Sequence, residues 1–181
     1  MKSTGRMDDA HPVKGLLAGA ASGLVGAWAM NQFQSAWSKA SEQLKSGEQN
    51  KTSQSEQKQS QEEQEDATMK AAGKLAKTAL GRDLSKEERK NAGALVHYAV
   101  GTFSGAVYGL LGEYLPLARI GFGTAFGAAL FLLADELAVP ALGLSGKATE
   151  APLSSHLYGL SSHLVYGASA EAVRRGIDMA A

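Results

Sequence analysis

Residues 95–111 read LVHYAVGTFSGAVYGLL, an apolar run inside a longer segment, 91–112, that carries no Asp, Glu, Lys or Arg. A helix needs about 20 predominantly apolar residues to cross the hydrocarbon core of a bilayer. The segment meets that length, and its glycines are tolerated in membrane helices, where small residues pack well. We therefore predict a transmembrane helix over 92–115.

Three other charge-free runs lie outward from this segment, at 15–38, 120–134 and 151–170. The run that ends at 134 is short, but apolar sequence resumes after Asp135-Glu136 and continues to Leu144. The pattern predicts an all-α integral membrane bundle of about four transmembrane helices. Their expected ranges are 14–37, 92–115, 118–144 and 152–175, so that 92–175 is a three-helix membrane region. A soluble bundle with buried Gly- and Ala-rich helices is the alternative.

The composition of the 181 residues excludes several classes of protein. Lys plus Arg and Asp plus Glu both number 18, so the chain lacks the basic excess of a nucleic-acid binder. Cysteine is absent, which excludes disulfides, thiolate catalysis, Cys-ligated zinc and iron–sulfur clusters. The sequence has no G-x-S-x-G elbow, Walker A loop, H-E-x-x-H or dinucleotide fingerprint. We therefore expect neither an enzyme nor a bound cofactor.

A polar stretch separates the first two expected spans. Residues 46–66 read SGEQNKTSQSEQKQSQEEQED, so we expect a disordered Gln/Ser/Glu-rich linker over 38–66. Helical spacing resumes in an amphipathic segment at 67–91, which would lie on the membrane surface or against the bundle. The apolar face of that segment carries Met69, Ala72, Leu75, Ala76, Ala79 and Leu80. Ser85 and Glu88 have the spacing of a capping box, which predicts a helix start there.

The two tails are expected to be short, at 1–13 and 176–181. We favour an uncleaved first span, because two acidic residues interrupt the basic region of a signal peptide; cleavage near Ala27-Trp28-Ala29 is the alternative. Pro140 should kink or end the third span, and Arg174-Arg175 should end the fourth at the membrane interface. Four spans place both tails on one side, and the distribution of Lys and Arg leaves the orientation open.

Glycines recur every four residues along three of the expected spans. The stripes are Gly15, Gly19 and Gly23 in the first span, Gly101, Gly105 and Gly109 in the second, and Gly123 with Gly127 in the third. Residues four apart lie on one helix face, and small residues let helix backbones approach closely in lipid. We predict that the stripes pack helices within one bundle. A homo-oligomer or pore interface is the alternative use of the same faces.

Ionisable residues inside apolar segments are candidates for a functional site. They are His97, Asp135, Glu136, His156, His163 and Glu171. Three interpretations are open: hydrogen bonds that fasten a polar fourth helix into the bundle, a proton-responsive group that makes the protein a channel- or transport-like assembly, and a haem or metal site. The spacing of these residues specifies no metal site. Asp135 shares a helix face with Gly127 and should point inward.

The second half of the chain also resembles a known family. The residues that carry the resemblance are His97-Tyr98, Gly101, Tyr108-Gly109, Glu113, Pro116, the stretch Pro140-Ala-Leu-Gly-Leu144 and the ending His163-Leu-Val-Tyr-Gly-Ala-Ser-Ala-Glu171-Ala-Val-Arg-Arg175. Over about 92–175 they are similar to the YagU-like proteins of the bacterial inner membrane, from which the Gln/Ser-rich insert departs. The resemblance implies a multi-pass protein of that membrane whose activity is undefined. We expect a structural or stress-related membrane component in contact with the lipid bilayer.

Overall fold

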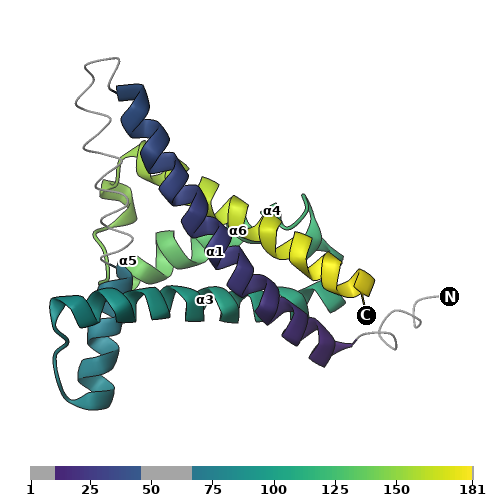
Figure 1. Cartoon of the computed structure of the whole chain (residues 1–181), viewed down its shortest axis with the longest axis horizontal. Helices are drawn as coiled ribbons and strands as arrows, with labels where there is room; N and C mark the ends of the chain where they lie inside the picture. Colours follow the sequence, from purple (N-terminus) through teal and green to yellow (C-terminus); the bar gives the residue numbers. More distant parts are fainter. Residues whose placement is uncertain (1–10, 46–66, 181) are drawn as a thin grey trace.

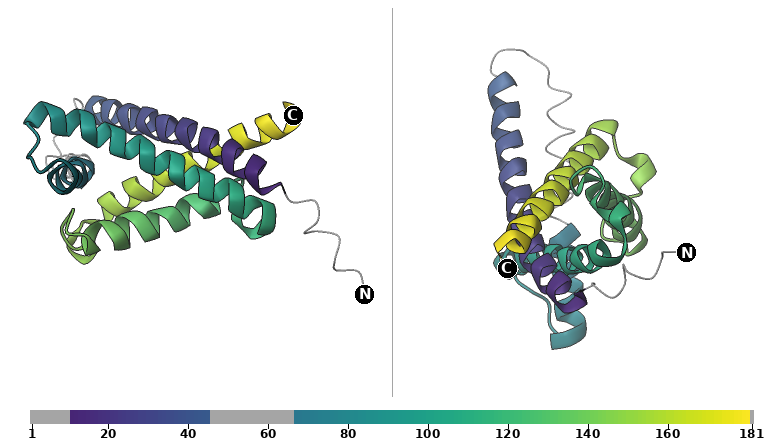
Figure 2. Two further views of the ribbon diagram at one scale, coloured as in Figure 1. Left: turned by 90° about the horizontal axis from the view of Figure 1, so that it is seen from below. Right: turned by 90° about the vertical axis from the view of Figure 1, so that its right-hand side faces the viewer.

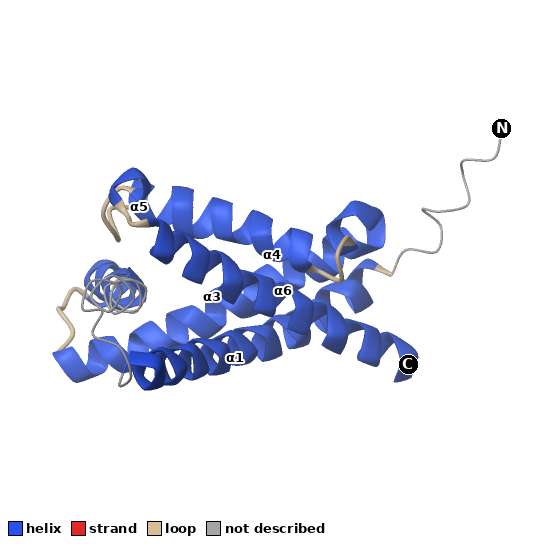
Figure 3. Ribbon diagram, turned by 90° about the horizontal axis from the view of Figure 1, so that it is seen from above, coloured by secondary structure: helices blue, strands red, loops and turns tan. Residues whose placement is uncertain are grey.

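The computed structural model describes residues 11–45 and 67–180, and all regular structure in these residues is helical, as expected (Figure 3). The elements are α1 (Pro12–Lys45), a helix over 67–80, α3 (Lys86–Tyr114), η1 (Pro116–Arg119), α4 (Thr124–Phe131), η2 (Leu132–Ala138), α5 (Val139–Ala141), η3 (Ala148–Glu150) and α6 (Leu153–Ala180). The expected tail residues 1–10 and linker residues 46–66 lie outside the described part of the chain.

The chain passes back and forth through the bundle (Figures 1 and 2). α1 and α4 run in one direction, and α3 and α6 return in the other. The start of α1 and the end of α6 lie together, because Lys14 and Asp178 form an ion pair of 3.8 Å. We call this the terminal end of the bundle. The opposite end, which carries α5 and the helix over 67–80, is the loop end.

Small residues form much of the interior, and large apolar residues face outward. Ala18, Ser22 and Ala27 of α1 are buried, whereas Phe103 of α3 and Leu133 of η2 are exposed. A water-soluble bundle buries side chains such as Phe and Leu. The inverted arrangement suits a bundle surrounded by lipid, where small residues let helices pack and large apolar ones meet the acyl chains.

Three helices are long and apolar enough to cross a membrane, by length and composition. They are Pro12–Ser41, Lys86–Tyr114 and Thr124–Ala141. The fourth expected span corresponds to α6, which is long enough but is not one of the three. Its serines and histidines lower its hydropathy, although it packs along α1 and α4. The structure therefore supports several membrane helices, and the count of four remains a prediction.

The glycine stripes of the first two expected spans meet each other. α1 and α3 are antiparallel, and each glycine of one stripe faces the backbone of the other. A Cβ atom added at Gly19 would lie 2.8 Å from the Cα of Gly109, and one added at Gly105 would lie 2.6 Å from the backbone nitrogen of Gly23. Only residues without side chains allow this approach, which brings the two backbones into direct dispersion contact.

α1 continues past the expected end of its span at residue 37. It remains helical to Lys45, so residues 38–45, which the sequence assigns to the disordered linker over 38–66, are helical instead. The indole of Trp37 lies 6.3 Å from the ring of Tyr158 on α6, and 5.7 Å from that of Phe33. Packing against α6 therefore supports the helix beyond its most apolar part, an effect that a hydropathy pattern does not capture.

α3 begins at the predicted capping box. The Ser85 hydroxyl accepts a hydrogen bond from the Glu88 N–H at 3.2 Å, and the Glu88 carboxylate accepts one from the Ser85 N–H at 2.8 Å. The preceding helix ends at Gly81, whose φ of 67° interrupts the right-handed helix. Glu88 also pairs with Arg82, and this hydrogen bond raises the pKa of the Arg82 guanidinium.

The helix over 67–80 packs against the bundle, one of the two expected locations. Met69 lies against Gly93 of α3, and the Lys74 ammonium donates a hydrogen bond to the Leu142 carbonyl at 2.7 Å. Its buried face is narrower than the sequence suggests, since the alanines Ala72 and Ala76 are buried whereas Leu75 is exposed.

The third expected span starts later than residue 118 and contains a distorted turn. Gly121, Phe122 and Gly123 all have positive φ angles, which a right-handed helix excludes, so α4 begins at Thr124. Farther on, η2 is a π-helix that leads directly into Pro140. Proline has no N–H to offer the Glu136 carbonyl, and its ring would collide with that group in an α-helix. The wider π turn avoids both problems.

Candidate functional site

The π-helix η2 presents two adjacent carboxylates to the histidines of α6. The Nδ1 atom of His156 lies 2.6 Å from Oε1 of Glu136, and the Nδ1 atom of His163 lies 3.6 Å from Oδ2 of Asp135. π-helical turns are frequent at functional sites because they re-aim side chains that a regular helix would separate. We call these four residues the acid–histidine cluster; the sequence predicted that Asp135 would face inward, and it does.

The two histidines of the acid–histidine cluster differ in their surroundings. His163 is buried, and its Nδ1 lies 2.9 Å from the Gly159 carbonyl on the preceding turn. A carbonyl accepts but cannot donate, so Nδ1 carries the proton and Nε2 is left as the basic atom of the neutral ring. His156 is half-buried, and its Nδ1 forms a short hydrogen bond with the Glu136 carboxylate.

A cavity of about 370 Å³ opens beside the cluster at the loop end of the bundle. Asp135, Glu136 and His156 line one part of it, and Phe131 and Tyr158 provide apolar walls. The connection between α5 and α6 closes the remaining part with polar residues, among them Ser145, Lys147 and Glu150. The acid–histidine cluster thus has a hollow with polar walls on one side and the packed helices on the other.

His97 of α3 makes its polar contact with α1 and not with the acid–histidine cluster in the described part of the chain. Its Nε2 lies 3.4 Å from the Ala27 carbonyl. The neighbouring Tyr98 accepts a hydrogen bond from the amide of Asn31 at 3.1 Å. His97 and Tyr98 thus join α3 to α1 through polar contacts.

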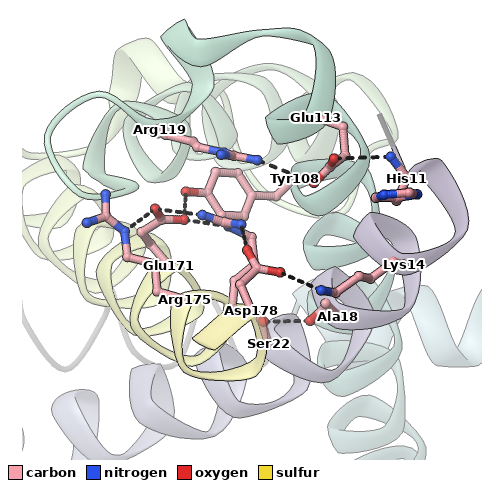
Figure 4. A network of polar contacts seen from close by, with 11 residues as sticks. His11, Lys14, Ala18, Ser22, Tyr108, Glu113, Arg119, Glu171, Arg175 and Asp178 are labelled. Carbon is pink, nitrogen blue, oxygen red and sulfur yellow. Dashed lines mark hydrogen bonds and ion pairs between the residues drawn. The ribbon is translucent and has the colours of Figure 1, made fainter. Parts of the chain in front are cut away.

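Glu171, the sixth candidate from the sequence, is not part of the acid–histidine cluster. It lies toward the terminal end of the bundle, where it is fully buried (Figure 4). Its carboxylate accepts hydrogen bonds from the Tyr108 hydroxyl at 2.6 Å, from Arg174 at 2.8 Å and from Arg175 at 2.6 Å. Glu171 contacts the start of α4 at Gly123, whereas Asp135 lies twelve residues farther along, about 18 Å in helical rise.

The arrangement around Glu171 also differs from the expected helix end. α6 continues to Ala180, and Arg174 is buried between Glu171 and Asp178 instead of marking the membrane interface. Figure 4 shows this network reaching Lys14 of α1 through Asp178. Every charge in it has a partner of opposite sign, as a buried ion network requires. The network therefore connects α1, α3 and α6.

The glycines of the third expected span pack against α6. A Cβ atom at Gly123 would lie 2.9 Å from the carbonyl carbon of Gly167, and one at Gly127 would lie 2.9 Å from that of His163. Sequence reasoning did not identify Gly159 and Gly167 as packing residues, although both lie four residues from His163. His163 replaces the middle glycine of the stripe and so hides its periodicity.

The cluster consists of side chains that can bind protons, but its geometry does not resemble a metal centre. Within residues 11–45 and 67–180, no three His, Asp or Glu side chains gather in a way that could hold a metal ion. Imidazole titrates near pH 6.5, and a carboxylate beside it supplies a second proton acceptor. Two such pairs next to a cavity form a short series of proton-binding groups.

Comparison with known proteins assigns the chain to a family without assigning an activity. No curated protein and no solved structure matches the chain. A protein family matches residues 45–172, a range that includes the acid–histidine cluster, Glu171 and all of α3 and α4. Because this range covers well over half of the 181 residues, the chain belongs to the family described as "Protein of unknown function (DUF1440)".

Proposed function

We propose that this chain is a multi-pass protein of the bacterial inner membrane whose acid–histidine cluster takes up and releases protons. The observation that carries the proposal is the pairing of Glu136 with His156 and of Asp135 with His163 on a π-helical turn beside a cavity. Proton relays in membrane proteins are built from such Asp, Glu and His groups facing the bundle interior. The protein would act as a proton-responsive assembly and not as an enzyme.

Packing needs alone do not account for the cluster. Buried ionisable groups cost free energy, and well-packed apolar residues of similar volume often replace them without loss of stability. The close glycine contacts of Gly123 and Gly127 already hold α4 to α6. Two acid–imidazole pairs at the end of that contact therefore favour a chemical role over a purely mechanical one.

A second candidate function is a structural or stress-related membrane component. The packed glycine stripes favour it, because they use close contacts within one chain to build a rigid bundle. In that case Asp135 and His163 would serve only to fasten α6, and their loss would lower stability without changing proton movement. A homo-oligomer is compatible with both candidates, since large apolar side chains such as Phe103 and Leu133 stay exposed.

The first experiment tests the membrane location. Cells expressing the protein are fractionated, and the membrane pellet is washed with alkaline carbonate. Retention in the pellet is expected, because apolar helices with internally satisfied backbones stay in lipid. Release into the supernatant would contradict integral insertion and turn the cluster into a site in water.

The second experiment measures proton movement in vesicles reconstituted with the purified protein and loaded with a pH-sensitive dye. Asp135→Asn is the test variant, since it keeps the size of the side chain and removes its titration. Glu150→Gln is the matched control, because Glu150 lines the same cavity but is exposed and paired with Lys147. Flux should fall in the first variant and persist in the second. Unchanged flux with lowered stability in Asp135→Asn would favour the structural candidate instead.

A further inference from the structure

Helices α3 and α6 share a sequence pattern. Residues 101–113 of α3 read GTFSGAVYGLLGE, and residues 159–171 of α6 read GLSSHLVYGASAE. The same residues occupy matching positions, with Gly101, Ser104, Val107, Tyr108, Gly109 and Glu113 recurring as Gly159, Ser162, Val165, Tyr166, Gly167 and Glu171. The shared pattern is G-x-x-S-x-x-V-Y-G-x-x-x-E, which glycine-rich composition alone does not produce.

Helices α1 and α4 match in the same way. Residues 15–24 of α1 read GLLAGAASGL, and residues 123–132, at the start of α4 and into η2, read GTAFGAALFL. Both stretches share the pattern G-x-x-x-G-A-A-x-x-L. The order of the two patterns along the chain is also the same. We call α1 with α3 the first half of the chain and α4 with α6 the second half.

Equivalent residues make equivalent contacts in the two halves. In the first half the side chain of Glu113 lies over Gly15, and in the second the side chain of Glu171 lies over Gly123. Ala27 contacts Gly101, and its counterpart Asp135 approaches Gly159, the counterpart of Gly101. The matching register of the contacts is independent of the sequence match, since two unrelated helix pairs could meet at any offset.

The middle of each contact is likewise equivalent, since Gly19 faces Gly105 and Gly127 faces His163. The two tyrosines of the shared pattern also behave alike. Tyr108 reaches from the first half to Glu171 in the second, and Tyr166 reaches from the second half to the Gly101 carbonyl in the first, both at 2.6 Å. Each tyrosine therefore crosses to the partner half, as an approximate two-fold relation requires.

We infer that the chain is an internal duplication of an antiparallel two-helix unit, α1 with α3 and α4 with α6, in which the second copy alone carries the acid–histidine cluster. Asp135, Glu136, His156 and His163 stand where the first copy has Ala27, Trp28, Tyr98 and Gly105. Pro140, which accompanies the π turn, stands where the first copy has Gln32. The first copy is thus the packing unit and the second the chemical one.

The assignment of chemistry to the second copy rests on the proposed function, whereas the duplication does not. Parallel repeats in membrane transporters are related by an axis along the membrane normal and place their sites at the interface between repeats. Here, by contrast, the hydrogen bonds of Tyr108 and Tyr166 cross the interface between the copies, whereas the acid–histidine cluster lies within the second copy. The proposed proton chemistry therefore belongs to one copy and not to the interface between them.

Disulfide cross-linking tests the duplication in the full chain, which has no native cysteine. Ala27→Cys with Gly101→Cys and Asp135→Cys with Gly159→Cys place cysteines at equivalent contacts, and both pairs should cross-link in membranes. The controls are Ala29→Cys with Gly101→Cys and Leu137→Cys with Gly159→Cys, in which two residues of helix turn one cysteine away. Cross-linking of the first pair alone, or of the controls as strongly, would overturn the duplication.

A repeat-transfer variant, Asp135→Ala with His156→Tyr, then tests the assignment of chemistry. At these two positions it gives the second copy the residues of the first copy, Ala27 and Tyr98. The equivalent positions of α1 and α3 already accommodate these side chains. The variant should elute and unfold like the parent protein and lose most of its proton flux in dye-loaded vesicles. Aggregation of this variant would contradict the equivalence of the two copies. An intact variant with parental flux would overturn the assignment of proton chemistry and leave the duplication standing.

Discussion

Replacing Gly105 by alanine should separate α1 from α3. The added Cβ would lie 2.6 Å from the backbone nitrogen of Gly23. Its nearest neighbours are all backbone atoms of α1, so no flexible side chain could move aside. Non-bonded carbon contacts are most favourable at about 3.5–4.0 Å. The helices must therefore part by about 1 Å, which forfeits roughly a quarter to a half of the attraction at each affected contact.

The expected magnitude follows from two opposing effects. Overpacking of a tight interface costs about 1–3 kcal/mol, and the upper part of that range applies because backbone cannot move aside like a side chain. Replacing glycine by alanine within a helix returns about 0.5–1 kcal/mol. We expect a net loss of about 2 kcal/mol, which is close to a 30-fold change in the unfolding equilibrium.

The assay is reversible unfolding of the purified protein in detergent, followed through the fluorescence of Trp28 and Trp37 on α1. Gly176→Ala is the matched control, since Gly176 lies within α6 and an added Cβ would meet no atom within 4 Å. That control should be stabilised by about 0.5–1 kcal/mol. Equal behaviour of Gly105→Ala and Gly176→Ala would refute the reasoning, because it would mean that α1 and α3 are not in backbone contact.

Three further predictions concern the buried polar groups and the π turn. Tyr108→Phe removes a hydrogen bond to a buried carboxylate and should cost about 1–3 kcal/mol in the same unfolding assay, more than Tyr166→Phe, whose lost acceptor is a neutral carbonyl. Arg174→Leu removes a buried charge partner of Glu171 and should lower the free energy of unfolding by about 3–5 kcal/mol. Arg175→Leu removes a half-exposed partner and should lower it by less than about 1 kcal/mol. Similar losses in the two variants would contradict the buried network. Pro140→Ala restores the missing N–H, so the π turn should revert to an α turn and disulfide formation between Asp135→Cys and Gly159→Cys should fall; undiminished cross-linking would show that proline does not cause the π turn.

Much of the helical architecture follows from the sequence because it depends on local physics. The apolar runs predict the helices, the four-residue glycine spacing predicts which faces pack, and Ser85 with Glu88 predicts where α3 begins. Pro140 predicts a disturbance in the third span, and η2 is that disturbance. Each of these signals acts within one or two helical turns, which is the range over which a periodic pattern carries information.

The features that were not predicted depend on distant parts of the chain. A glycine stripe specifies a face but not its partner, so the antiparallel contact of Gly19 with Gly105 could not be foreseen. Glu171 shares a helix face with His163, yet the two belong to different ends of the bundle because helical rise separates them. Arg174 looks like an interfacial charge until its burial beside Glu171 and Asp178 is known.

The length of α1 has a mechanical consequence for whatever follows it in the chain. Its 34 residues rise about 51 Å, against a hydrocarbon thickness of about 30 Å. If α1 crosses the membrane from its first turns, roughly 20 Å of helix stands clear of the apolar layer at the loop end. The last turns of α1 then act as a rigid stalk, and the point where the chain leaves it is held well away from the lipid surface.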